Sequence, residues 1–251
     1  MSAEKSLVQA VEADGGWLYR VGGVSALLLG LGYIVTIPLY VYAGAPPHEA
    51  EAWLTYLAGK TTVWWAILGL SVLTDLLFIP LALALYYALK GVNRNVTLLA
   101  TAFVLLFVGL DLAVTWSNYA ALITLGERYA SATTEVQRAT YVVAAQYPSA
   151  VLASTLEAVY SILVLSLGIL LMGLVMLKSA FGKTTAIVGV VTGALGIVSV
   201  AGPFVLPALS SAIILASVLT TVWVLLVGFR LLRLGLGQSV ALASESALAS
   251  A

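Results

Sequence analysis

Six long apolar stretches follow one another along the chain and constrain its fold more than any other feature. A helix needs about 20 mostly apolar residues to cross the hydrocarbon of a bilayer, and each stretch is at least that long. Hydrophobic residues make up 62% of the chain and charged residues 9%, which is too apolar for a water-soluble domain. The sequence therefore predicts an all-α fold: a polytopic membrane helical bundle with six transmembrane helices. The predicted spans are residues 21–42, 62–89, 96–122, 150–177, 184–206 and 211–232.

The predicted membrane domain covers residues 21–234 and has a segment of different character on each side. Residues 1–20 are expected to form a polar cytoplasmic leader, because acidic residues interrupt any apolar core of a secretory signal. Residues 235–251 are rich in Leu, Gly, Ser and Ala, a composition that predicts a mobile cytoplasmic tail.

The positions of the basic residues predict the orientation in the membrane. Short loops that carry Lys and Arg stay on the cytoplasmic side. An inside N-terminus places eight basic residues in the cytoplasm, namely Lys5, Arg20, Lys90, Arg94, Lys178, Lys183, Arg230 and Arg233. It leaves three outside, namely Lys60, Arg128 and Arg138. We therefore expect a multi-pass protein of the plasma membrane with both termini in the cytoplasm.

The first of two larger external loops predicts a short interfacial helix. It begins after Pro47, places Trp53, Leu54 and Leu57 on one side, and ends at Gly59. The second loop predicts another such helix. Thr134 and Gln137 have capping-box spacing, and the helix is expected to end before Pro148. The two helices either cover the outer mouth of the bundle or only anchor it at the membrane interface.

Three acidic side chains fall well inside the predicted spans: Asp75, Asp111 and Glu157. A charge at the middle of a bilayer costs about 2.5 to 3.5 kcal/mol even on the insertion scale, so such groups face the bundle interior and are candidates for function. Polar residues three, four or seven positions away share a helix face with each acid. These neighbours are Ser71 for Asp75, Thr115 and Asn118 for Asp111, and Ser154, Tyr160 and Ser161 for Glu157.

The three polar faces predict a shared cavity that opens outward, with Trp116 and Tyr119 near its mouth. Two acids close together in a medium of low dielectric are not both ionised cheaply, so at least one is expected to be protonated. The leading hypothesis is a cavity that binds or transports a small polar solute, a proton or a cation. Three alternatives stay open: acids that only fix helix register, an intramembrane hydrolase using Asp75 and Asp111, and a non-catalytic partner or assembly subunit.

Other chemistries lack the residues they need. The chain has no cysteine, its single histidine, His48, lies in an external loop, and no lysine lies in the middle of a span. Glycine loops of the kind that bind phosphates are missing. Eleven basic residues balance eleven acidic ones without forming a patch, which argues against nucleic acid. The sequence thus predicts no metal site and no cofactor, and its expected partners are the lipid bilayer and a small polar ligand or cation.

Small residues recur at a spacing of four in two spans. Gly189 and Gly193, with Gly196 one turn further, form one such face, and Ala26 and Gly30 form another. This spacing lets helices approach closely. It favours packing within the bundle, and a homo-oligomer through the glycine faces is the further expectation.

Three segments carry a resemblance to a known family: residues 111–119 (DLAVTWSNY), 146–153 (QYPSAVLA) and 166–173 (SLGILLMG). They resemble a family of bacterial membrane proteins known as domain of unknown function 4386, over about residues 17–234. The resemblance implies six spans. It implies no activity and no catalytic residues.

Overall fold

The computed structural model describes the backbone of residues 2–249 and the side chains of residues 16–237. Over this range the fold is all-helical, and no strand occurs in it. The α-helices are α1 (Ser2–Ala43), α2 (Ala50–Leu57), α3 (Thr61–Leu110), α4 (Ser117–Ser131), α5 (Glu135–Leu152), α6 (Thr155–Ala158), α7 (Val164–Met176), α8 (Lys183–Ala201) and α9 (Ala212–Ala249). Two π-helical segments, η1 (Asp111–Trp116) and η2 (Val159–Leu163), and two 3-10 turns, η3 (Gly202–Phe204) and η4 (Pro207–Ser211), join them.

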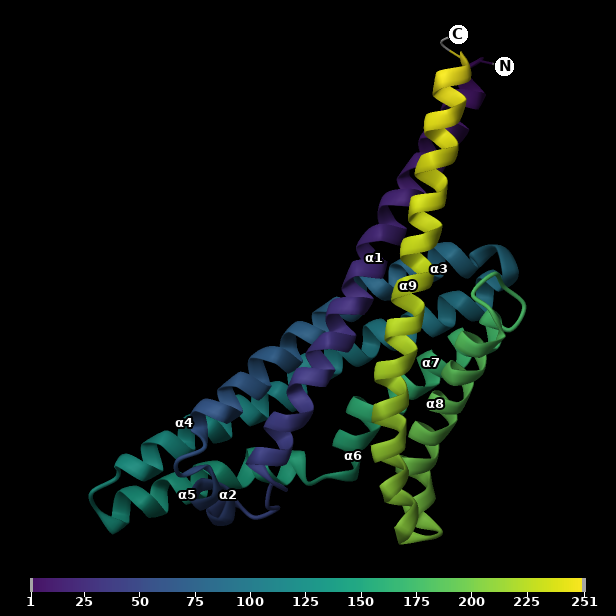
Figure 1. Cartoon of the computed structure of the whole chain (residues 1–251). Helices are drawn as coiled ribbons and strands as arrows, with labels where there is room; N and C mark the ends of the chain where they lie inside the picture. The colour runs from purple at the N-terminus through teal and green to yellow at the C-terminus, as the bar shows by residue number, and fades with distance from the viewer. Residues whose placement is uncertain (1, 250–251) are drawn as a thin grey trace.

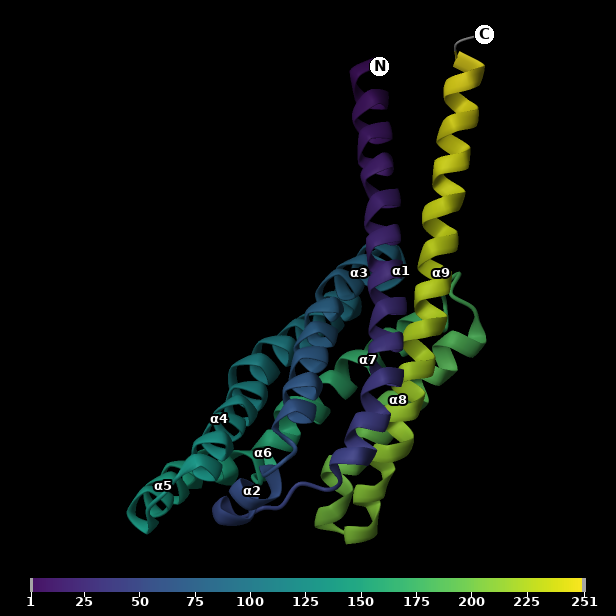
Figure 2. The same ribbon diagram turned by 60° about the vertical axis from the view of Figure 1, so that its left-hand side comes forward.

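Five helical segments of the described chain are long and apolar enough to cross a membrane: Gly16–Ala43, Thr61–Ser131, Thr155–Met176, Lys183–Phe204 and Pro207–Gly237. The chain is therefore a multi-pass α-helical membrane protein. Helices α1 and α9 pack along each other, and both extend to the same end of the molecule (Figures 1 and 2).

The second of these segments is 71 residues long and turns back on itself at Asn93. Asn93 has non-helical backbone angles (φ −155°, ψ 94°), and its side-chain Oδ1 accepts a hydrogen bond from the Val96 amide at 3.2 Å. The side chain thus caps the helix that follows. The rings of Phe78 and Phe107, from the two halves of α3, meet with centroids 5.6 Å apart. The two halves therefore lie side by side, as Figure 1 also shows.

Both predicted terminal segments have a helical backbone. Helix α1 begins at Ser2 and includes the predicted leader, and α9 runs on to Ala249 through the predicted tail. Residues 1, 250 and 251 lie outside the described part of the chain. The cytoplasmic location of both segments and the mobility of the tail stay predictions.

The helix predicted in the first loop forms as α2, and its apolar side is buried in the protein. Trp53, Leu54 and Leu57 are each at most 2% exposed and pack with residues of α3, α4 and α5. The Tyr56 hydroxyl donates to the carbonyl oxygens of Ala43 and Gly44, which fixes α2 to the end of α1. The apolar side of α2 is therefore covered by the chain's own helices instead of facing lipid headgroups.

The helix predicted in the second loop begins where expected but is longer. The Thr134 hydroxyl oxygen accepts from the Gln137 amide at 3.2 Å and caps α5. The prediction that the helix ends before Pro148 is wrong, because α5 continues to Leu152. A proline inside a helix removes one hydrogen bond, and its ring clashes with the carbonyl four residues earlier, which kinks or breaks the helix. Here the helix continues past Pro148, and its end closes through the Ala153 amide and the Ser149 carbonyl at 3.0 Å. Helix α5 packs on α4 and α2, so these three helices form one group.

The small-residue faces lie at close contacts inside the bundle. A Cβ atom on Gly193 would come within 2.6 Å of the Leu170 backbone nitrogen, and one on Gly30 would come within 2.6 Å of a Leu225 methyl group. These positions let α8 approach α7 and α1 approach α9. The chain's own helices cover both faces, and a homo-oligomer through them stays a prediction.

Candidate functional site

A cavity of about 380 Å³ lies inside the bundle and is lined by α1, α3, η1, η2, α7, α8 and α9. Helix α1 contributes residues near its Ala43 end, and α9 contributes residues near its Ala212 end. These two ends lie away from Ser2 and Ala249, so the cavity occupies the part of the bundle that is remote from the chain termini. A volume of this size is typical of small-molecule sites.

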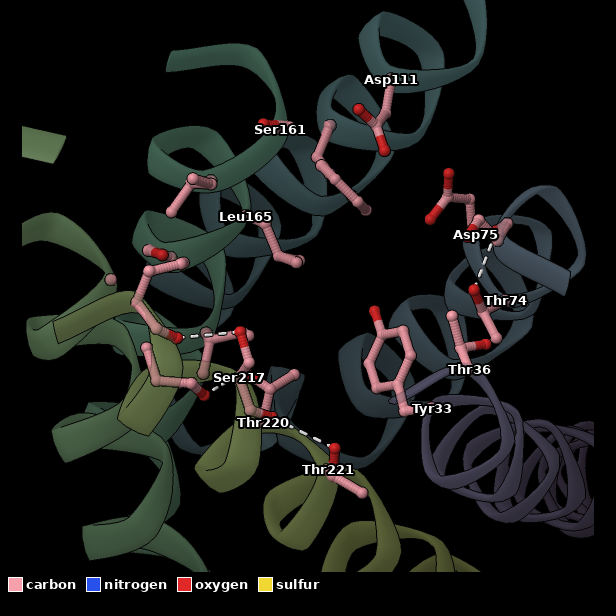
Figure 3. A pocket seen from close by; sticks show the side chains of 18 of the residues that line it. Tyr33, Thr36, Thr74, Asp75, Asp111, Ser161, Leu165, Ser217, Thr220 and Thr221 are labelled. Atoms are coloured by element: carbon pink, nitrogen blue, oxygen red, sulfur yellow. Dashed lines mark hydrogen bonds between the residues drawn. The ribbon is translucent and has the colours of Figure 1, made fainter. Parts of the chain in front are cut away.

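Two carboxyl groups lie on the cavity wall, and both come from the folded-back α3 hairpin and its extension. Asp75 and Asp111 are each 4% exposed and line the same cavity. Their carboxyl groups point toward one another (Figure 3). The contact between Phe78, one turn after Asp75, and Phe107, one turn before Asp111, holds the two helices together at this level. The antiparallel packing of the α3 halves therefore brings the two acids together.

The two acids differ in their hydrogen bonds. The Trp116 indole nitrogen donates to Asp75 Oδ2 at 2.7 Å. Asp111 Oδ1 is buried and has no hydrogen-bond partner among the described residues. A buried polar atom without a partner costs about 1 to 3 kcal/mol, and more when it is charged. Asp111 thus lines the cavity and keeps one buried oxygen to which no described residue donates, which is unusual unless a proton or another donor is held there.

The π-helical segment η1 determines which residues accompany Asp111 on the wall. In a π-helix the backbone bonds join residues five apart, so Trp116 follows Asp111 one turn later on the same side. Both residues line the cavity. Side chains donate hydrogen bonds to backbone carbonyls of this wider turn. Ser117 Oγ donates to the Ala113 carbonyl at 2.6 Å, and Asn118 Nδ2 donates to the Val114 carbonyl at 2.7 Å.

Glu157 lies apart from the acid pair. It does not line the cavity, and its carboxylate accepts a hydrogen bond from Thr115 Oγ1 at 3.4 Å. Its position follows from a break in the helix after α5, where the Ser154 hydroxyl oxygen accepts from the Glu157 amide at 3.2 Å and starts α6. The structure therefore brings together two of the three predicted acids and connects the third to η1 through Thr115.

The other predicted site residues divide between the cavity and its surroundings. Ser71 and Trp116 line the cavity with the two aspartates. Asn118 supports the η1 backbone, and Tyr160 is half-buried on η2 without lining the cavity. Tyr119 lies behind the wall, where its ring stacks on Trp64 at 5.3 Å and contacts Trp116 at 5.4 Å.

Sequence reasoning missed the contributions of the first and last spans. Hydroxyl side chains from α1 and α9 line the cavity, namely Tyr33, Thr36, Tyr40, Ser217, Thr220 and Thr221. Their spacing of three, four or seven residues was a signal that these helices have a polar face. The Thr36 hydroxyl donates to the Gly32 carbonyl at 2.8 Å and the Thr220 hydroxyl to Ala216 at 2.8 Å, so their oxygens remain free to accept. Figure 3 shows the Tyr33 hydroxyl pointing into the cavity.

The cavity wall carries acid and hydroxyl groups without a basic side chain. None of its lining residues is Lys, Arg or His. His48 is exposed in the connection between α1 and α2. Among the described residues no group of three or more His, Cys, Asp or Glu side chains is arranged to hold a metal ion.

The comparisons with known proteins give a family and no activity. The model of one family, described as a domain of unknown function (DUF4386), matches residues 21–235. No curated protein and no solved structure matches the chain.

Proposed function

Because the chain belongs to the DUF4386 family, a domain of unknown function, we propose its function from the cavity: it binds a small polar solute or cation there and moves it or senses it. The observation that carries this proposal is the pair of facing carboxyl groups of Asp75 and Asp111, one of which has a buried oxygen without a partner. Groups of this kind inside a membrane mark ion or substrate paths in many membrane proteins.

The proposal includes the chain's arrangement in the membrane. It has six spans, because the 71-residue segment reverses at Asn93 and a straight helix of that length would be about 107 Å long at 1.5 Å per residue. The protein lies in the plasma membrane, and both of its termini are in the cytoplasm. Arg20, Lys90 and Lys178 support this orientation as part of the basic excess at one end. The cavity then opens to the outside.

The chain offers a direct test of this arrangement because it has no cysteine. We expect a single cysteine from Ser131→Cys to react with a membrane-impermeant maleimide in intact cells. A single cysteine from Asn95→Cys is expected to react only after permeabilisation. Both positions are exposed, so access should depend on the side of the membrane alone. Labelling of Asn95→Cys in intact cells with protection of Ser131→Cys would reverse the orientation.

The acid pair supplies a mechanism for binding. Two facing carboxyls in a low dielectric are not both ionised cheaply, so a shared proton leaves the empty pair with about one negative charge. A cationic or donor-rich solute supplies the hydrogen bond that Asp111 Oδ1 lacks. Release of the shared proton then couples solute binding to proton movement.

Asp111→Asn tests this mechanism. We expect the variant to lose solute binding or proton-coupled flux in reconstituted vesicles while it keeps its size-exclusion profile and helical circular dichroism. Glu135→Gln is the matched acid-to-amide control, because Glu135 pairs with Arg138 at an exposed site and does not line the cavity. Normal binding and flux in Asp111→Asn would refute the role of the acid pair.

A second candidate function is an intramembrane hydrolase, and the facing of Asp75 and Asp111 favours it over other enzyme classes. Such an enzyme uses one carboxyl as a base and one as an acid on a shared water. It predicts that Asp75→Asn and Asp111→Asn each abolish cleavage of a peptide or ester substrate in membranes. Binding that survives without any turnover would favour the first candidate. The third alternative, an assembly subunit, predicts instead that another chain co-purifies at a fixed ratio.

A further inference from the structure

We propose that the solute of this cavity is an organic cation, namely a protonated amine that carries an apolar group. This inference rests on the proposed binding function and narrows it to one class of ligand. It follows from the charge of the cavity wall, the unsatisfied acceptor on it, and the apolar surface opposite that acceptor.

The charge of the wall selects for a cation. Asp75 and Asp111 are the titratable acids of the lining, and its other titratable groups are the phenols of Tyr33 and Tyr40. No basic side chain lines the cavity to balance the acids. An anionic solute would therefore be repelled, and in a low dielectric that repulsion is larger than in water.

The unsatisfied acceptor selects for a hydrogen-bond donor. Asp111 Oδ1 is buried and unpaired, whereas Asp75 Oδ2 already accepts from the Trp116 indole. An ammonium group has three donors and no acceptor. It can therefore donate to the Asp111 carboxyl group, which lines the cavity, and to nearby hydroxyl oxygens such as that of Tyr33, which points into the same space (Figure 3).

The rest of the wall selects for an organic cation over a metal ion. Hard cations such as Ca²⁺ take six to eight oxygen ligands. Eleven of the 22 lining residues carry a hydroxyl group, yet most of the surface that the wall presents to the cavity is apolar, from side chains such as Phe107, Ile162 and Leu165. A bare ion would leave most of the 380 Å³ volume against apolar surface. The aromatic side chains also attract organic cations through their ring faces.

The test is a selectivity series on the full-length protein in lipid nanodiscs, measured by isothermal titration calorimetry at neutral pH. The probes are 2-phenylethylamine, its neutral counterpart 2-phenylethanol, the anion phenylacetate, and the sodium and calcium chlorides. We expect the amine to bind at least about tenfold more tightly than the alcohol, because a hydrogen bond between charged groups is stronger than one from a neutral hydroxyl. Phenylacetate and the inorganic salts are expected not to bind.

Two variants locate the binding. Asp111→Asn should weaken amine binding at least about tenfold relative to the unaltered protein. Binding of the amine to the nanodisc lipid is the same in both samples, so it does not affect this comparison. Phe107→Ala should weaken amine binding less, and Phe229→Ala, which removes an exposed ring at 58% exposure outside the cavity, should leave it unchanged.

The outcomes separate this inference from the function on which it rests. If the amine and the alcohol bind with equal affinity and Asp111→Asn weakens both, the inference of an organic cation is refuted. The proposed solute-binding function of the cavity is then still supported. Binding of sodium or calcium in place of the amine has the same two consequences. If no probe binds in a way that depends on Asp111, both the organic-cation inference and the proposed solute-binding function are refuted. The comparison of amine with alcohol uses the unaltered protein, so it decides the inference even if a variant fails to fold.

Discussion

The aromatic layer beneath α2 and the cavity wall around Asp111 lie next to each other, yet they are packed very differently. In the aromatic layer, Trp53, Trp64 and Tyr119 meet with ring centroids 5.3 to 5.8 Å apart, and Trp53 and Trp64 are at most 2% exposed. The cavity wall encloses empty volume and an unpaired carboxyl oxygen. The aromatic layer has one unpaired group of its own, the Trp64 indole nitrogen.

The aromatic layer serves stability, whereas the cavity wall serves the proposed function. Close-packed aromatic rings stabilise a fold through burial and ring contacts. A cavity with an unpaired acid on its wall lacks such contacts and lowers stability, and features of this kind are retained where they serve a function. Mutations in the two regions should therefore differ in the sign of their effect on stability and not only in its size.

The largest expected effect is loss of the aromatic layer's central ring. Trp64→Ala removes a fully buried side chain that contacts the rings of Trp53 and Tyr119. We expect a loss of about 3 to 5 kcal/mol of stability, measured as a lower apparent Tm in detergent. Trp17→Ala is the control, because Trp17 is 66% exposed. Equal effects of the two variants would show that the layer is not the more stabilising region.

A smaller effect is expected where the two regions meet. Trp116→Phe keeps an aromatic ring but removes the indole N–H that donates to Asp75 Oδ2 at 2.7 Å. We expect a loss of about 1 to 2 kcal/mol together with weaker solute binding. Trp65→Phe removes a comparable bond, from the Trp65 indole to Glu127 Oε1 at 2.9 Å, at an exposed site. It should leave binding unchanged, and an equal loss of binding in both variants would contradict the proposed role of Trp116.

The smallest effect should have the opposite sign. Asp111→Asn replaces the unsatisfied acid by a neutral amide that donates as well as accepts. We expect stability to be unchanged or to rise by up to about 2 kcal/mol, seen as an equal or higher apparent Tm. A Tm that falls as far as that of Trp116→Phe would assign Asp111 a structural role and would remove the contrast between the two regions.

The sequence was sufficient to select Asp75 and Asp111 as candidate site residues, because a charged residue in a long apolar helix is conspicuous. It also predicted that Trp53, Leu54 and Leu57 lie on one side of α2, since they follow helical spacing. It did not predict that the chain's own helices bury that side. It was not sufficient for Glu157, whose separation from the pair depends on the helix break at Ser154. The chain's membership of its family was likewise evident from the sequence.

Two features of the site needed the structure for physical reasons. A π-helical turn shifts the helix face by one residue, so Trp116 takes the place on the wall that α-helical spacing assigns to Thr115. The sequence of residues 111–116 contains no signal that predicts a π-helical turn. The hydroxyls of α1 and α9 were overlooked because Ser and Thr can satisfy themselves on the preceding helical turn, as Thr36 and Thr220 do here, and are therefore common in spans without any ligand.

The indole of Trp116 gives the cavity an optical reporter that requires no label. This ring donates to Asp75 on one side and contacts the ring of Tyr119 on the other. A change in the charge or occupancy of the acid pair alters the electric field at the indole, which shifts the wavelength and the intensity of tryptophan emission. The six tryptophans of the chain include only one that lines the cavity. Emission that changes with solute in the unaltered protein, but not in Trp116→Phe at a solute concentration that still saturates this variant, would follow cavity occupancy in real time.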